Sequence, residues 1–338
     1  MTANLTSGVF NRGIQAWHGE GDVIDNLTIT PAAMFRQASA LFPVTKLPLT
    51  YRIPSVDAPN EFEPRTSKRS SLVHGITGEE LGTCGKGYEV VPNQRLLDMA
   101  EAVADKIIMD AVIVLEGGRK VAFTGLIKDG GIADILPSDS VARFLVGYLG
   151  HDGCTGVSAG FGSIRVVCSN TLAAHVGSSA IQRTLAHRKG VGLEVDALIN
   201  SINVEQRRFD EDIESFKEMA RIDCSDAQFR EMLKELYAKE LAVPIKGRDG
   251  SEDRPRDLGD IRVCCRMADA WLGVGEAGLG LDIPGVRGTA WAAYNAITEA
   301  LTSQQAGEAR NNIRRFSSTF FGSVRARIDQ ARKLCLSL

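Results

Sequence analysis

The chain has 338 residues, of which 44% are hydrophobic and 24% are charged, and its formal net charge at pH 7 is −3. This composition is that of a folded globular protein, and it excludes a disordered chain, a collagen and a small disulfide scaffold. Because the chain as a whole is slightly acidic, a nucleic-acid-binding function requires local basic surfaces.

Seven cysteines are scattered along the chain without a C-x-x-C pair. Their odd number and their spacing indicate reduced thiols, which are typical of cytoplasmic proteins. The first residues lack the basic and apolar regions of a secretory signal, and no apolar run reaches the roughly 18 residues of a membrane span. We therefore expect a cytoplasmic protein that makes no contact with a membrane.

The first third of the chain combines turn signals with short helical patterns. Thr30-Pro31 predicts a helix over 31–42, since threonine is a good N-cap and proline suits the first helical position. The segment 43–71 holds five of the eleven prolines and predicts a loop or an edge strand. Residues 72–76 and 83–91 resemble strands, and the apolar spacing over 94–108 predicts an amphipathic helix.

The middle of the chain contains the strongest hairpin signal. Two β-branched runs, 111–115 and 120–127, flank the turn from Glu116 to Arg119. The apolar runs 141–150 and 156–172 predict a second antiparallel pair.

Helical patterns dominate from residue 195 onward. They predict a long helix over 195–221, a second helix capped by Ser225, and further helices after 260. The fold class is therefore α+β, with an antiparallel β-rich core and a central helix followed by a helical C-terminal half. We expect a core domain over 1–194, a helical hairpin over 195–244, a linker loop over 245–260 and a helical region over 261–338.

The charge distribution is uneven, because no acidic residue occurs between Asp152 and Glu194. A chance gap over buried strands explains part of this window but not its polar end, so we expect a basic surface that binds an anionic polymer. Asn170 and Thr171 would add neutral phosphate contacts. The cations of this window are Arg165, Arg183, Arg188 and Lys189.

Two further clusters are basic. Arg65, Lys68 and Arg69 lie in a segment rich in serine and threonine, which predicts a mobile arm that contacts phosphates. From Arg310 to Lys333, seven cations stand against Asp329, although a solvated helix face is the common explanation for such a run. The rings that we consider for base stacking are Phe144, Tyr148 and Phe161.

Three motifs argue weakly for other chemistries. The G-x-S-x-G string around Ser158 runs on into a strand-like segment rather than a helix, which disfavours a hydrolase. The G-x-G-x-x-G string over 273–280 follows a helical pattern, which disfavours a dinucleotide site. The spacing of potential zinc ligands matches no familiar pattern, so we expect neither a metal nor another cofactor. These ligands are His151, Cys154, Cys168 and His175.

Several longer motifs resemble one family. His151-Asp152-Gly153 leads to R-V-V-C-S-N-T-L over 165–172, and G-x-x-Y-x-x-V-x-N occupies 85–93. Trp17-His18-Gly19 and the segments 288–304 and 315–323 agree as well. In these motifs the chain resembles a family of phage and plasmid proteins that carry a domain of unknown function, number nine-thirty-two.

This resemblance implies a mobile genetic element inside a bacterial host, and the architecture is similar to single-strand annealing proteins of the Red-beta/RecT type. We therefore expect an ATP-independent protein that binds and anneals single-stranded DNA. A phage or host DNA-processing protein is a further expected partner. The alternatives are an interaction protein that counters a host defence or restriction system and, less favoured, a hydrolase that uses Ser158.

The expected protein is a homo-oligomer. An apolar stripe on the predicted helix over 195–221 either packs in a local helical hairpin or covers a neighbouring subunit. A row of identical subunits would strengthen weak phosphate contacts through effective concentration. The stripe consists of Leu198, Ile202, Phe209, Ile213 and Phe216.

Overall fold

The computed structural model describes residues 5–11, 21–54, 62–165, 183–201, 206–246, 253–275, 277–302 and 323–338. These residues form two compact units. The first unit contains the described residues up to Asp129, those from Phe144 to Phe161 and those from 183 to 201. The second unit contains Gly130–Arg143, 162–165 and the described residues from Gln206 onward. This division differs from the four consecutive segments expected from the sequence, because 130–143 groups with the C-terminal helices.

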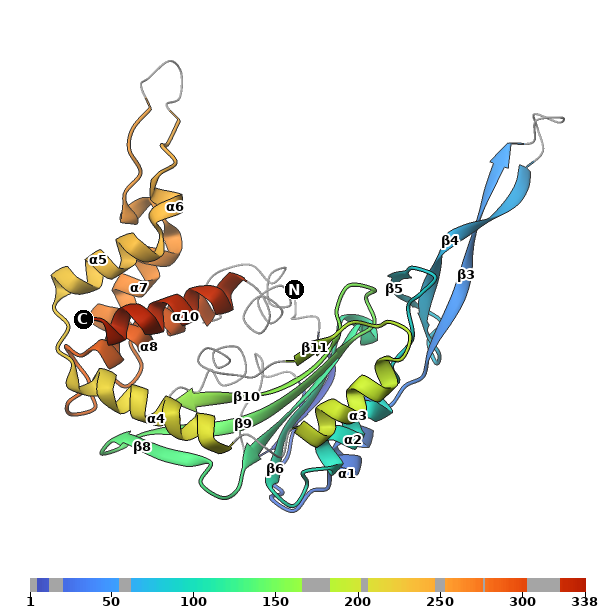
Figure 1. Ribbon diagram of the computed structural model, residues 1–338, viewed down its shortest axis with the longest axis horizontal. Coiled ribbons are helices and arrows are strands. Elements are labelled where there is room, and N and C mark those ends of the chain that lie inside the picture. Colours follow the sequence, from blue (N-terminus) through green and yellow to red (C-terminus); the bar gives the residue numbers. More distant parts are fainter. Residues whose placement is uncertain are drawn as a thin grey trace. The chain divides into compact units, whose positions relative to one another are not determined.

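The element order confirms the α+β class, with strands mainly in the first half and helices mainly in the second (Figure 1). The strands are β1 (Leu5–Phe10), β2 (Asp22–Val23), β3 (Val44–Pro54), β4 (Phe62–His74), β5 (Glu80–Cys84), β6 (Ile107–Leu115), β7 (Lys120–Ile127), β8 (Ile132–Leu136), β9 (Asp139–Gly150), β10 (Val157–Arg165) and β11 (Arg183–Leu185). The α-helices are α1 (Pro31–Gln37), α2 (Gln94–Glu101), α3 (Val191–Ser201), α4 (Gln206–Arg221), α5 (Asp226–Leu236), α6 (Ala238–Leu241), α7 (Arg262–Leu272), α8 (Ala290–Thr302) and α10 (Ser323–Leu336).

The main sheet has the strand order β11-β10-β9-β7-β6-β1-β2, and β8 pairs with β9. The hairpin predicted around Glu116 is confirmed, because β6 and β7 pair antiparallel from Ile107 opposite Ile127 to Leu115 opposite Lys120. Its turn contains Gly118 at φ 96°, where a Cβ atom would lie 2.8 Å from the His74 ring. Only glycine suits that position, since both the backbone angle and the space exclude a side chain.

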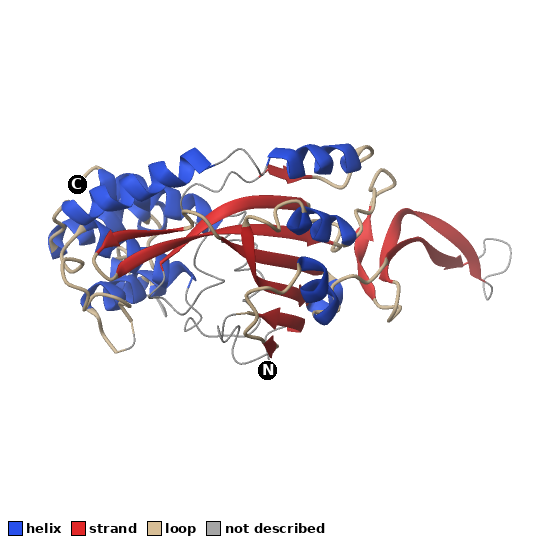
Figure 2. Ribbon diagram, turned by 90° about the horizontal axis from the view of Figure 1, so that it is seen from below, coloured by secondary structure: helices blue, strands red, loops and turns tan. Residues whose placement is uncertain are grey.

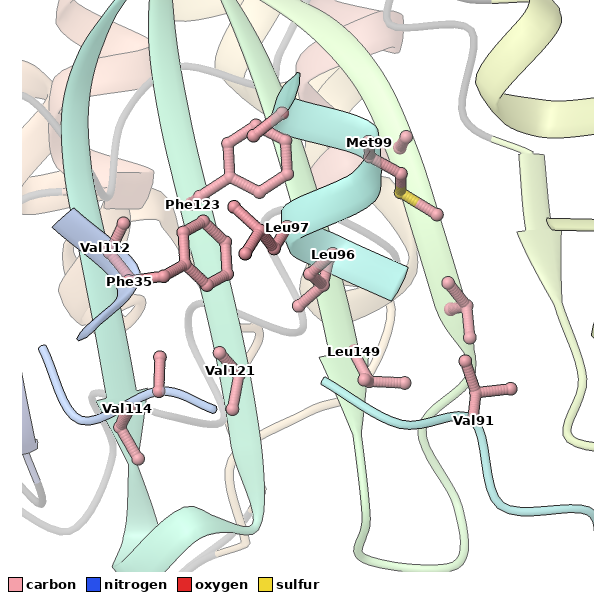
Figure 3. Packing of buried hydrophobic residues seen from close by; sticks show 14 of the residues in the cluster. Phe35, Val91, Leu96, Leu97, Met99, Val112, Val114, Val121, Phe123 and Leu149 are labelled. Carbon is pink, nitrogen blue, oxygen red and sulfur yellow. The ribbon is translucent and has the colours of Figure 1, made fainter. Parts of the chain in front are cut away.

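Helices α1, α2 and α3 cover one face of the main sheet (Figures 1 and 2). Thr30 caps α1 as expected, and its hydroxyl accepts from the Ala33 amide at 3.2 Å. α2 ends at Glu101, earlier than the sequence pattern suggested, because the apolar residues from Ile107 onward pair in β6. The rings of Phe35 and Phe123 lie 5.9 Å apart at the centre of this layer. Figure 3 shows this core, which includes Leu96, Leu97, Met99, Val112, Val121 and Leu149.

A second sheet, in the order β3-β4-β5, is built from the proline-rich segment. The expected edge strand is confirmed as β3, but the loop expected around Arg65, Lys68 and Arg69 is wrong, because all three lie in β4. Pairing between β3 and β4 extends over most of this segment despite its prolines. Pro48 and Pro54 lie in β3, which is an edge strand, and edge strands tolerate proline.

The second unit is mainly helical, and its core includes a group of packed aromatic rings. Phe216 of α4 lies 4.9 Å from the Trp291 ring of α8, and the Trp291 indole donates to the buried Asp139 carboxylate at 2.8 Å. Ser225 caps α5 as expected, through a capping box with Gln228. The single helix predicted over 195–221 is instead two helices, α3 in the first unit and α4 in the second.

Within the described segments, no helix has the length and apolar character that a membrane crossing requires.

Candidate nucleic-acid interface

A two-stranded ribbon extends beyond the third strand of the second sheet (Figure 1). We call it the arm, and it comprises residues 48–54 of β3 and 62–69 of β4. β5 pairs with β4 only from Ser70 to Val73, whereas β3 pairs with β4 as far as Phe62. Among the described residues the arm therefore has no third strand beside it, and Figure 2 shows it as two strands without a covering helix.

The arm exposes two aromatic rings. Tyr51 is 54% exposed and Phe62 is 60% exposed, which is unusual for large apolar side chains. Tyr51 lies directly opposite Arg65 in the register of the two strands, and Pro54 lies opposite Phe62. Exposed rings beside cations are the combination that binds unpaired bases and phosphates together.

Cations outnumber carboxylates among the described residues of the arm. Arg52 and Lys68 are exposed and form no ion pair within the described part of the chain. Arg65 contacts Glu63 at 3.0 Å, and the side chains of this pair are 55% and 46% exposed. Glu63 is the one carboxylate of the described arm, while Asp57 and Glu61 occur in the connecting segment outside the described residues.

A β-bulge in β4 interrupts the regular alternation of side chains at the base of the arm. The register passes from Pro48 opposite Ser70 to Thr50 opposite Thr66, so β4 holds extra residues at this point. Such a bulge turns side chains away from regular alternation. Within it, the Arg69 guanidinium donates to the Thr83 hydroxyl at 2.7 Å and to the Thr83 carbonyl at 3.2 Å.

Close backbone packing joins the second sheet to the H-D-G motif. A Cβ atom on Gly82 of β5 would lie 2.5 Å from the Asp152 carbonyl carbon, and one on Gly153 would lie 2.0 Å from the Thr83 oxygen. Asp152 shapes this loop, since its carboxylate accepts from the Thr155 amide at 2.6 Å and the Thr155 hydroxyl at 2.7 Å. Burial by itself raises the pKa of Asp152, but the hydrogen bonds from Thr155 and Cys154 outweigh it and lower that pKa.

His151 is fully buried and fixed by Asn93. Its Nε2 lies 2.7 Å from the Asn93 side-chain oxygen, and the Asn93 amide nitrogen donates to the Phe42 carbonyl at 3.3 Å. This second bond orients the amide, so the His151 Nε2 carries the proton and donates. Burial, the largest cause, and the neighbouring His187 lower the pKa of His151 to about 3, so the ring is neutral at pH 7.

Tyr88 and His187 complete this joint between the two sheets of the first unit. Their rings stack at 4.5 Å, and the Tyr88 hydroxyl donates to the Gly150 carbonyl at 3.4 Å. The His187 Nδ1 donates to the Glu89 carbonyl at 3.0 Å, and burial lowers the pKa of His187. The family motifs around Gly85 and His151 therefore form a buried support for the base of the arm. From the sequence, these motifs indicated only a family resemblance. The packing roles of Tyr88 and Asn93 in this support became visible only in the structure.

The acid-free window of the sequence is not acid-free in space. Arg188 pairs with Glu194 at 2.9 Å, and the Glu89 carboxylate accepts from the Gly190 amide at 2.9 Å. Lys189 is exposed. Arg165 and Arg183 belong to β10 and β11, but their side chains are outside the described atoms, and Asn170 and Thr171 lie outside the described residues.

Two of the rings considered for stacking in the main sheet are unsuitable. Phe144 and Tyr148 are 3% and 1% exposed, so the expectation that they stack on bases is wrong. Phe161 is partly buried and packs against the core of the first unit.

Of the C-terminal cations, Arg327 pairs with Glu240 and Arg332 pairs with Asp212, whereas Lys333 is exposed. Arg310, Arg314 and Arg315 lie outside the described residues, and so does the side chain of Arg325.

The motifs that argued for other chemistries have structural explanations. Ser158 is 2% exposed and lies within β10 opposite Thr184, not at a turn between a strand and a helix. In the glycine string over 273–280, the amides of Gly278 and Leu279 donate to the Glu299 carboxylate at 3.0 and 3.2 Å. Of the zinc ligands considered, Cys168 and His175 lie outside the described residues.

Comparison with known proteins places most of the chain in one family. Residues 80–333 match the family model described as Domain of unknown function (DUF932). The matched region begins at β5, so the arm precedes it, whereas the H-D-G motif and its buried support lie inside it. No curated protein and no solved structure matches the chain. By this match, and in agreement with the motifs of its sequence, the chain belongs to the DUF932 family.

Proposed function

We propose that this protein binds single-stranded DNA through the arm and anneals complementary strands without ATP. The observation that carries the proposal is the pairing of exposed rings with an excess of cations on a ribbon that no other described strand or helix covers. The resemblance of the motifs to phage and plasmid proteins supports a role in the DNA processing of a mobile element.

The cations of the arm are available to phosphates. Arg52 and Lys68 are exposed without an ion pair among the described residues, and Arg65 shares only a surface pair with Glu63. Surface pairs of this kind contribute about 0–1 kcal/mol, so a phosphate can replace the carboxylate at little cost. Lys46, at the base of β3, donates to the carbonyls of Lys86 and Tyr88 at 2.9 Å and adds positive charge there.

The rings favour unpaired bases over duplex. Tyr51 and Phe62 are more than half exposed to solvent, and stacking of a base on an exposed ring contributes about 1–3 kcal/mol. In duplex DNA the faces of the bases are already covered by their neighbours. A ribbon with exposed rings therefore gains more from a single strand than from a double helix.

Prolines on both edges of the arm oppose an alternative mode of binding, in which a strand of another protein pairs with the arm. Pro48 and Pro54 on β3 and Pro64 on β4 have no N–H group to donate to an added strand. A continuous ladder is thus interrupted on either edge. The arm is better suited to a ligand recognised through side chains.

The test is the salt dependence of binding to an oligothymidylate. If five cations of the protein each neutralise one phosphate, each releases a counterion from the DNA. A plot of log K against log salt then has a slope near −3.5, at about −0.7 per phosphate contact. The triple variant Arg52→Gln, Arg65→Gln, Lys68→Gln should weaken binding and flatten the slope by about 2.

A charge-matched control separates the arm from the net charge. Lys217→Gln, Lys234→Gln and Lys239→Gln remove the same charge from α4, α5 and α6 of the second unit. We expect the control to leave the slope unchanged. Equal slopes for the arm variant and the wild-type protein, with both folded, would contradict the proposed function.

We also propose that the protein acts as a homo-oligomer, because a row of arms would hold one strand at many points. The expected stripe does not supply the subunit contact at Ile213 and Phe216, since both are buried in the second unit. Light scattering with and without oligothymidylate tests the assembly. A monomer under both conditions at micromolar concentration would exclude it.

A further inference from the structure

Strand register distributes the rings and arginines of the arm over two faces. Tyr51 lies opposite Arg65, and the next pair is Arg52 opposite Pro64. Because side chains of neighbouring residues in a strand point to opposite faces, Tyr51 and Arg65 share one face, and Arg52 lies on the other. Two residues further, Pro54 opposite Phe62 returns to the face of Arg52.

In the regular part of the ribbon beyond the bulge, each face therefore holds one exposed ring and one arginine. On the first face, Tyr51 and Arg65 are direct cross-strand partners, which places their Cβ atoms about 5 Å apart. On the second face, Phe62 and Arg52 are diagonal neighbours, which long side chains bridge over about 7–8 Å. Both faces are open to solvent, because Tyr51 and Phe62 are more than half exposed.

We propose that the arm has two separate binding sites for single-stranded nucleic acid, one on each face. This inference rests on the proposed function, and it adds the number of strands that one arm holds. A base stacks on Tyr51 while Arg65 contacts the adjacent phosphate, and a base of a second strand stacks on Phe62 beside Arg52. Two strands held on opposite faces of one ribbon are close enough to meet at its edges, which is what annealing requires.

Each of the two sites combines one aromatic ring with one arginine, but the residues next to the arginine differ. The first face also holds Glu63, opposite Ile53, and its carboxylate pairs with Arg65 at 3.0 Å, so a phosphate that binds Arg65 has to displace it. The second face holds Pro54 and Pro64, so no described carboxylate faces Arg52 there. We therefore expect the Phe62 site to bind more tightly than the Tyr51 site.

The experiment is a titration of the full-length protein with a fluorescent oligothymidylate of about six nucleotides, which is near the lower end of known site sizes. Wild-type protein should bind two oligonucleotides per chain. Tyr51→Ala and Phe62→Ala should each remove one of them, weakening the affected site roughly 5- to 150-fold. The other site should keep its affinity within about twofold, as expected for independent sites.

Ile76→Ala is the matched control, since Ile76 is 74% exposed in the turn after β4 and lies outside the arm. It should retain both sites. Thermal unfolding of all variants checks the fold, which should persist because every substituted side chain is exposed.

The outcomes separate the two proposals. If neither the wild-type protein nor any variant binds the oligonucleotide, the proposed function is wrong. If wild-type protein binds one oligonucleotide per chain, or either single substitution abolishes all binding, binding is real but the two-site arrangement is wrong. If Tyr51→Ala or Phe62→Ala instead dissociates an oligomer in the absence of DNA, the rings form a contact between copies of the chain, and the two-site arrangement is likewise overturned.

Discussion

The side chains of His151 and Asn93, 58 residues apart in the sequence, form a 2.7 Å hydrogen bond in the buried interior of the first unit. This bond joins the H-D-G motif to the segment that precedes α2, and through Phe42 it reaches the start of β3. The H-D-G motif, which lies inside the region matched by the family model, therefore packs at the base of the arm. Its conformation should control the stability of the first unit.

Acid should destabilise the protein through His151. Its pKa in the folded state, about 3, is below the ordinary value of 6.5, so the unfolded state binds the proton more readily. The stability that this group contributes is present above pH 6.5 and is lost progressively as the pH falls toward 3. Urea unfolding at several pH values should show a loss of about 1.4 kcal/mol per pH unit below pH 6 from this one group.

In His151→Gln this part of the slope should disappear, whereas the contribution of His187, whose pKa burial also lowers, should remain. Asp152 does not act in this window, because its folded pKa lies below 3.8 and its effect begins at lower pH. An identical slope in His151→Gln and the wild-type protein between pH 5 and 6 would show that the ring is not buried in its neutral form.

Gly153→Ala should destabilise the first unit strongly. Gly153 has φ +78°, and its added Cβ atom would lie 2.0 Å from the Thr83 oxygen. Gly190 has a similar φ, +85°, with no atom within 4 Å of its added Cβ, so Gly190→Ala isolates the backbone strain. We expect about 1–2 kcal/mol for Gly190→Ala and about 2 kcal/mol more for Gly153→Ala, measured by chemical denaturation. Equal losses would mean that the backbone of β5 moves freely away from the motif.

Arg332→Met should leave a buried carboxylate without its cation. Arg332 contacts Asp212 at 2.7 Å, where the two side chains are 18% and 6% exposed. Burial raises the pKa of Asp212, against the opposing effect of Arg332. We expect a loss of about 3–5 kcal/mol for the single change and partial recovery when Asp212→Leu is added. A double variant less stable than Arg332→Met would contradict this account of the pair.

Glu299 should hold the glycine string in place. Its carboxylate accepts from the Gly278 and Leu279 amides, and hydrogen bonds to charged groups contribute about 1.5–3 kcal/mol each. Glu299→Ala should increase amide hydrogen exchange over 277–281 and lower the thermal midpoint. Glu299→Gln keeps one acceptor oxygen and should fall between that variant and the wild-type protein. Unchanged exchange in Glu299→Ala would indicate that the loop is held by its other contacts.

Local patterns in the sequence determined much of the architecture. The turn at Glu116 between two β-branched runs led to the β6–β7 hairpin, and Thr30 and Ser225 marked the starts of α1 and α5. These features depend on residues within a few positions of one another, where backbone preferences act directly. The motifs also indicated the family, because a motif is recognised from the sequence without knowledge of the structure, and the family model confirms it.

Tertiary structure alone decided which charges and rings are available. Arg188 was expected on an acid-free surface, yet Glu194 pairs with it from the next helix. Phe144 was a candidate for stacking but is buried, whereas Tyr51 became exposed because its ribbon extends past β5. Burial and ion pairing depend on which segments meet in space, and composition along the chain does not specify this. The sequence therefore identified the family and the class of fold, while the pairing of β3 and β4 beyond the end of β5 determined which rings and cations of this ribbon are exposed.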